Sequence, residues 1–173
     1  MNASYELARP DRVTVGTVGP VGERVFLLQV REGRQLVTMK LEKQQVAALS
    51  AYLGRLLRGL ERPAELPTGS ELELEPFDEP DFVVGTIGVT YDNDTDRVML
   101  VADEVDTSEP EEPEGPEGSS TRMAMTREQA AALAIKGTEL VESGRPPCPL
   151  CGYPLDARGH VCPRTNGNSP PLT

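Results

Sequence analysis

The acidic segment at residues 103–117 constrains this chain more than any other feature, because it cannot join a hydrophobic core. It holds eight acidic residues and no basic residue, and Pro and Gly interrupt it repeatedly. A segment of one charge sign with so little apolar surface cannot offset the entropy lost on ordering. We therefore predict that residues 103–120 are a disordered linker between a core at residues 1–102 and a separate C-terminal part.

The overall charge limits the partners of the chain. The net charge of −11 argues against broad binding to a nucleic-acid backbone, which depends on Lys and Arg displacing counterions. Residues 121–173 nevertheless hold six basic and four acidic residues, so a local anion site is allowed there. The start of the chain lacks the apolar stretch of a signal peptide and no run is long enough to span a bilayer, so we expect a cytoplasmic protein without membrane contact.

The first hundred residues show the pattern of a small sheet followed by a helix. Five segments are rich in β-branched or alternating apolar residues: 13–18, 24–31, 36–41, 82–91 and 97–102. Between the third and fourth, apolar residues recur at three- and four-residue steps over 42–61, which indicates an amphipathic helix. Its opposite face is either plain solvated surface or a docking surface for an acidic partner, and carries Lys43, Gln44, Arg55, Arg58 and Arg62.

Two motifs in this part imitate ligand-binding loops. Gly16, Gly19 and Gly22 suggest a nucleotide-binding loop, but their spacing is G-x-x-G-x-x-G, Pro20 interrupts it, and a strand follows where a helix should begin. The aspartates in "DNDTD" at residues 92–96 imitate the start of a calcium loop, but Arg97 stands where that loop requires glycine. Both stretches are better explained as turns.

A second helix follows the acidic segment. Thr126 and Gln129 have the spacing of a capping box, and Gly144 followed by a proline ends the helical pattern. A helix this short is marginal alone, so Leu133, Leu140 and Val141 should pack on the sheet or on another chain. We assign residues 121–144 to this helix, which packs on the core, and residues 145–173 to a zinc knuckle and tail.

All three cysteines and the single histidine lie in "CPLCGYPLDARGHVC" at residues 148–162. Cys148 and Cys151 form a C-x-x-C turn, and His160 with Cys162 completes a tetrahedral Cys3His set for zinc. Four protein ligands leave no position for water, so we expect a structural Zn²⁺. A tail with free thiols and a thioredoxin-like redox pair stay open, although the prolines before Cys148 do not suggest the helix that redox chemistry needs.

No reaction follows from the remaining residues. Nucleotide deaminases share the P-C-x-x-C half-motif but need an H-x-E, and His160 is followed by Val161. Glu73 and Glu75 lie among alternating acids that suggest a strand edge rather than a tuned pair.

Several stretches together resemble a known family. "RVFLLQV", "LEKQQVAAL", "VGTIGVTYD" and "GRPPCPLCGYPLDARGHVCPRTNG" are similar to a family of uncharacterised actinobacterial proteins that is labelled domain of unknown function 3090. The resemblance implies no established activity. It implies a gene neighbourhood with a phosphatidylinositol-kinase-like and a histidine-phosphatase-like protein, and hence a shared phosphoryl-transfer pathway. Ala157 departs from the proline expected in the family's "LDPxGH".

These observations lead to one expected architecture and three functional hypotheses. The architecture is α+β, a small antiparallel sheet with a packed helix, plus a C-terminal helix leading into the zinc knuckle. We favour a non-enzymatic accessory or adaptor protein with a protein partner, such as the kinase-like neighbour that the resemblance implies. Arg145, Arg158 and Arg164 are then candidates for contacting an anion on that partner. The alternatives are nucleic-acid binding by the knuckle, and an enzyme that uses carboxylates of the sheet.

Overall fold

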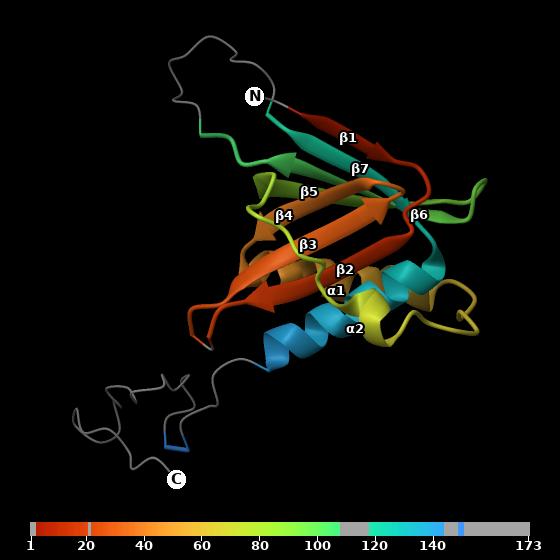
Figure 1. Cartoon of the computed structure of the whole chain (residues 1–173). Coiled ribbons are helices and arrows are strands. Elements are labelled where there is room, and N and C mark those ends of the chain that lie inside the picture. The colour runs from red at the N-terminus through yellow and green to blue at the C-terminus, as the bar shows by residue number, and fades with distance from the viewer. Residues whose placement is uncertain (1–2, 21, 108–117, 144–148, 151–173) are drawn as a thin grey trace.

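The computed structural model describes residues 3–20, 22–107, 118–143 and 149–150 of the chain. Within these residues the chain forms seven strands, two α-helices and one short 3-10 helix (Figure 1). The strands are β1 (Ser4–Leu7), β2 (Arg12–Val18), β3 (Val25–Glu32), β4 (Gln35–Leu41), β5 (Phe82–Asp92), β6 (Arg97–Glu104) and β7 (Ser120–Met125). The helices are α1 (Lys43–Arg58), η1 (Gly69–Leu72) and α2 (Arg127–Glu142).

The strands form one mixed sheet in the order β1-β7-β6-β5-β4-β3-β2. The α+β class is therefore confirmed, but the prediction of a purely antiparallel sheet is wrong at two pairs. The pairs β1–β7 and β4–β5 are parallel. The β4–β5 pair is parallel because α1 returns the chain toward the end of the sheet where β4 starts before β5 begins. This is the connection that a crossover helix makes.

The two strands that the sequence did not predict, β1 and β7, pair with each other. Residues 103 and 104 end β6 and residue 120 begins β7, so the connection between these strands is shorter than the predicted linker. The Ser119 N–H donates to Glu104 Oε2 at 2.7 Å and holds the two ends of the connection together. The middle of the predicted linker, residues 108–117, lies outside the described residues.

The sheet is strongly curved. A flat sheet of seven strands would separate its edge strands by about 29 Å. Yet β1 and β2 lie at opposite edges, and the chain from Leu7 to Arg12 can span no more than about 18 Å. The curvature also brings β1 close to Asp81, the residue just before β5. The Tyr5 hydroxyl of β1 donates to Asp81 Oδ1 at 3.3 Å. The sheet is therefore curved rather than planar.

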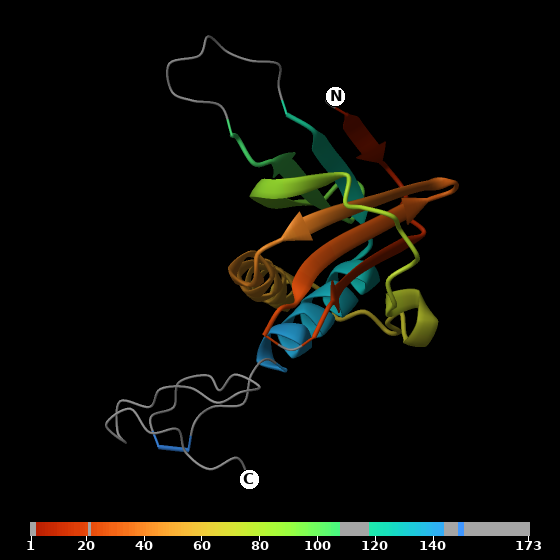
Figure 2. The same cartoon turned by 60° about the vertical axis from the view of Figure 1, so that its left-hand side comes forward.

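Both α-helices lie together on one side of the sheet (Figure 2). Each begins with a capping box, Glu42 with Gln45 in α1 and the predicted Thr126 with Gln129 in α2. The core between the helices and the sheet includes Leu28, Val30, Met39, Leu53, Leu100, Met123, Met125 and Leu133. Leu140 and Val141 are partly buried against the same core, which confirms that the stripe of α2 packs on the sheet.

The aspartate motif is a turn, as the sequence predicted, whereas the glycine motif is a turn only after Gly16, which lies within β2. Gly19 has φ +93°, which L-residues rarely adopt, in the turn between β2 and β3. Between β5 and β6, the Asp94 N–H donates to Asp92 Oδ1 at 3.0 Å, and Asp96 has φ +54°. An aspartate tolerates this left-handed backbone better than most side chains because it bonds locally.

Candidate functional site

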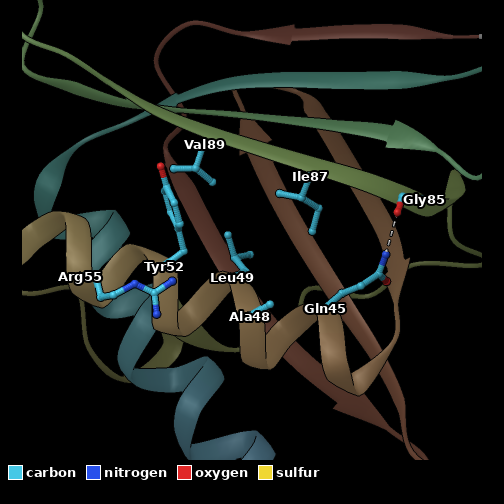
Figure 3. A pocket seen from close by; sticks show the side chains of 8 residues that line it. All are labelled: Gln45, Ala48, Leu49, Tyr52, Arg55, Gly85, Ile87 and Val89. Atoms are coloured by element: carbon cyan, nitrogen blue, oxygen red, sulfur yellow. Dashed lines mark hydrogen bonds between the residues drawn. The ribbon is translucent and has the colours of Figure 1, made fainter.

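A groove of about 440 Å³ lies between α1 and β5. It forms where β5 diverges from β4, because the two strands pair only at Met39–Phe82 and Lys40–Val83. Figure 3 shows side chains of α1 and of β5 pointing toward one another across it. The lining residues are Gln45, Ala48, Leu49, Tyr52 and Arg55 from α1, and Gly85, Ile87 and Val89 from β5.

The helical wall is one stripe of α1. Positions 45, 48, 49, 52 and 55 follow the three- and four-residue steps that place side chains on one helix face. Leu49 is buried and anchors this stripe to the core, whereas Tyr52 is 44% exposed. The stripe borders the exposed face of α1 that carries the basic residues, so the groove opens beside positive charge.

The strand wall depends on a β-bulge at Gly85. The pairing of β5 with β6 shifts register between Val84 and Thr86. Before the shift Phe82 and Val84 point into the core, and after it Ile87 and Val89 do. With strict alternation from Val84, residues 86, 88 and 90 would have faced the helices instead. The bulge therefore supplies the apolar side chains of this wall.

Gly85 is required by a close approach of the backbone. A Cβ atom at this position would lie 2.7 Å from the Val105 Cα, a distance that real Cβ atoms do not show. Val105 also donates its N–H to the Val83 carbonyl at 2.8 Å, which holds the bulge against the end of β6. The strand end of the groove is thus fixed by main-chain contacts.

Gln45 fixes the distance between the two walls. Its Nε2 donates to the Val84 carbonyl at 3.0 Å and to the Gly85 carbonyl at 3.2 Å, and Figure 3 shows the second of these bonds. Its Oε1 accepts the Glu42 N–H at 2.8 Å in the capping box. One side chain therefore both starts α1 and ties it to the bulge of β5, so this end of the groove is preorganised.

Tyr52 and Arg55 form the other end of the helical wall. The Arg55 guanidinium carbon lies 5.9 Å from the centroid of the Tyr52 ring, within the range of a cation–π interaction. Arg55 is exposed and is the single charged residue among the lining residues. This end of the groove therefore combines an aromatic surface with a positive charge.

Beyond Val89 the strand is tied to the start of α2. The Tyr91 hydroxyl donates to Asp96 Oδ1 at 2.5 Å, and the Arg127 Nε lies 2.9 Å from the same oxygen. The hydrogen bond from Tyr91, followed by those from Arg127, lowers the pKa of Asp96. The same bond to Asp96 raises the pKa of Tyr91, because the phenol donates only while it is protonated.

Of the two carboxylates considered for an enzyme, Glu73 and Glu75, that of Glu75 has structural partners. Glu75 Oε2 lies 2.7 Å from Arg31 Nε, and its Oε1 lies 3.7 Å from Arg12 Nη1. The predicted strand edge at Glu73 and Glu75 is instead an irregular segment after η1. Gln29 of β3 pairs with its main chain, since the Gln29 Nε2 donates to the Glu75 carbonyl at 3.0 Å. This segment therefore serves to cover the outer face of β2 and β3.

The predicted zinc ligands lie outside the described residues, namely Cys148, Cys151, His160 and Cys162. The same holds for Arg145, Arg158 and Arg164. Residues 149 and 150 are the described part of that segment and form a turn. Across the described ranges the structure brings together no group of three or more His, Cys, Asp or Glu side chains that could hold a metal.

Sequence reasoning identified Arg55 and the basic face of α1 but missed the groove. The helical stripe could have been found from the spacing of residues 45 to 55. The strand wall could not, because the bulge at Gly85 reverses which side chains face the helix, and a glycine in a β-rich run is only a weak signal of a bulge.

The fold and the groove define an α+β protein in which one helix and the diverging edge of a curved mixed sheet enclose an apolar cleft. The chain belongs to the family described as Protein of unknown function (DUF3090), whose model matches residues 5–162. No curated protein and no solved structure matches the chain. Among the described residues, neither α-helix is long and apolar enough to cross a membrane.

Proposed function

We propose that this protein is a non-enzymatic accessory or adaptor protein and that the α1–β5 groove is its partner-binding surface. The observation that carries the proposal is the groove itself, with apolar side chains on both walls, an exposed tyrosine and a single charged residue. Exposed aromatic residues and arginines are the residues that most often dominate binding energy at protein interfaces. The volume lies in the range of ligand-binding clefts.

The rigidity of the walls supports recognition without large rearrangement. Gln45 joins α1 to β5 at one end of the groove, and Arg127 joins the β5–β6 turn to α2 beyond the other. Arg127 also donates to the Glu61 carbonyl at 2.5 Å, just after α1. A preorganised site loses less conformational entropy when a partner binds, which raises affinity for a given set of contacts.

The proposal also includes a structural zinc in the C-terminal segment, held by Cys148, Cys151, His160 and Cys162. Its support is the ligand set in the sequence, which suits a tetrahedral ion and a reducing, cytosolic location. Arg145, Arg158 and Arg164 would then form a second, anion-binding contact. The resemblance of the sequence to its family suggests the phosphatidylinositol-kinase-like neighbour as the partner and a phosphoryl-transfer pathway as the setting.

A matched pair of helix variants tests the groove. Ala48 lines it, whereas Ala51 is exposed on the same helix and does not. Peptides selected for binding to the purified full chain from a random display library are measured by fluorescence anisotropy. We expect Ala48→Arg to weaken peptide binding by about tenfold or more, because position 48 would lie at the centre of the interface. Ala51→Arg should leave the affinity within about twofold, because position 51 lies outside the interface. A library that yields no binder, or binders that are insensitive to Ala48→Arg, would contradict the proposal.

A further inference from the structure

The groove contains an unpaired strand edge. β5 has eleven residues, and its ladder with β4 consists of Phe82 and Val83. Its ladder with β6, on the opposite side, continues to Asp92. In a paired strand, alternate residues turn their N–H and C=O groups away from the neighbour. In the described part of the chain, β5 from Thr86 to Asp92 thus has backbone groups on the groove side that no strand occupies.

We propose that β5 binds an extended, acidic peptide segment of a partner protein as an additional strand, in the groove between β5 and α1. This inference rests on the proposed function, because it specifies how the same groove recognises its partner. The added strand would lie beside β5 where β4 would have continued, because β4 ends at Leu41 and the chain then turns into α1. Main-chain hydrogen bonds would supply affinity, as in other complexes formed by strand addition.

The position of the groove determines which side chains such a strand must carry. Side chains of an added strand alternate between the two faces of the sheet in step with β5. Those on the inner face would contact Leu49 and Ile87, so alternate residues should be apolar. Those on the outer face would point to solvent. The chain's own acidic segment at residues 103–117 is a poor occupant, because residues 103 and 104 already belong to β6 and Val105 is its single apolar residue apart from proline.

Charge complementarity indicates that the segment carries acidic residues at its ends, where it passes the basic rim of the groove. Arg55 is the one charged lining residue, and Arg58 follows one turn later on an exposed position of α1. Unlike Arg31 and Arg127, these two arginines have no carboxylate within ion-pair distance among the described residues. A basic rim beside an apolar groove favours an acidic segment and raises its association rate, in a salt-dependent way.

The test uses a defined probe, a capped fluorescent peptide of about eight residues that alternates valine and threonine between glutamate pairs at its two ends (the Val/Glu peptide). Its counterpart with lysine in place of glutamate controls for charge. We expect the Val/Glu peptide to bind the full chain and the Val/Lys peptide to bind at least about tenfold more weakly. N-methylation of the Val/Glu peptide should weaken binding at alternate positions only, because every second N–H faces β5. Backbone amide shifts in the protein should centre on residues 86–92.

Charge reversal supplies the protein-side control. Arg55→Glu should reduce the affinity for the Val/Glu peptide by about tenfold and flatten its salt dependence. Arg34→Glu changes an exposed arginine in the β3–β4 turn. This variant should leave the affinity and its salt dependence unchanged. Thermal unfolding of each variant checks that the fold is retained.

Three outcomes would overturn strand addition. The first is a Val/Glu peptide that does not bind, or whose affinity is insensitive to Arg55→Glu. The second is an N-methylation profile without a two-residue period. The third is concentration-dependent self-association that Ala48→Arg abolishes, which would assign the groove to a second copy of this chain. In the first two cases, library peptides whose affinity still falls with Ala48→Arg would support the groove as a partner-binding surface and overturn only strand addition.

Discussion

Arg127, the first residue of α2, lies within ion-pair distance of Asp96 in the β5–β6 turn, with 2.9 Å between Nε and Oδ1. The pair connects the end of the strand wall of the groove to the second helix. Asp96 also accepts the Tyr91 hydroxyl. Because both partners favour the ionised carboxylate, the pKa of Asp96 is lower in the folded chain than its ordinary value of 3.8.

We expect this linkage to appear in acid unfolding. A group whose pKa is lowered by folding stabilises the fold above its unfolded pKa and loses that contribution as pH falls through the folded value. The melting temperature of the wild type should therefore fall below pH 3.8 more steeply than that of Asp96→Asn. Asparagine is the suitable replacement because it tolerates the φ of +54°. Thermal scans from pH 7 to acid pH measure the difference, and parallel curves would show that the pair contributes nothing.

The crossing of α1 and α2 depends on Gly137. A Cβ atom at this position would overlap Ser50 Oγ and lie 3.4 Å from Val46 Cγ1. We expect Gly137→Ala to destabilise the protein by about 1–3 kcal/mol, because the cost of overpacking exceeds the gain from alanine's higher helix propensity. Ser50→Ala removes the overlapping atom, so the double variant should recover most of the loss in denaturant unfolding.

Gly54→Ala is the control for helix propensity, since nothing lies within 4 Å of its Cβ position. This change in α1 should stabilise the protein by roughly 0.5–1 kcal/mol. Equal effects of the alanines at 54 and 137 would contradict the overlap at the crossing.

Two glycines of β5 should respond differently to alanine. A Cβ at Gly85 would lie 2.7 Å from the Val105 Cα, which is backbone and cannot move aside, whereas nothing lies within 4 Å at Gly88. We expect Gly85→Ala to cost about 2–4 kcal/mol and to weaken peptide binding, and Gly88→Ala to change stability by less than about 0.5 kcal/mol. Urea unfolding separates the two. A mild effect at Gly85 would mean that the bulge adapts and does not fix the groove.

Zinc content tests the C-terminal prediction. Protein purified without chelator should hold one zinc per chain, and Cys148→Ser should lose it by elemental analysis. The variant should be cut more readily by protease within residues 144–167, while the sheet keeps its cooperative unfolding, because the core has apolar residues of its own. Absence of zinc, or zinc that persists without both Cys148 and Cys151, would show that the segment is not a metal site.

The sequence by itself determined the local elements. The helices follow from three- and four-residue periodicity and, for α2, from the capping box, and the hairpins follow from alternating runs joined by turn residues such as Gly33. These signals are local because helix hydrogen bonds and tight turns join residues close in the chain. The basic face of α1 was predictable for the same reason.

Only the tertiary structure decided how the sheet is completed and where the groove lies. β1 and β7 are short, and they form a sheet edge because residues 116 positions apart pair, as Ser4 does with Ser120. No local pattern encodes such a pairing, since its free energy comes from contacts with strands already in place. The groove likewise needs two distant contacts: the bulge at Gly85 against Val105, and the Gln45 amide that bonds β5. Each is a contact between segments far apart in the chain, which a single sequence does not specify.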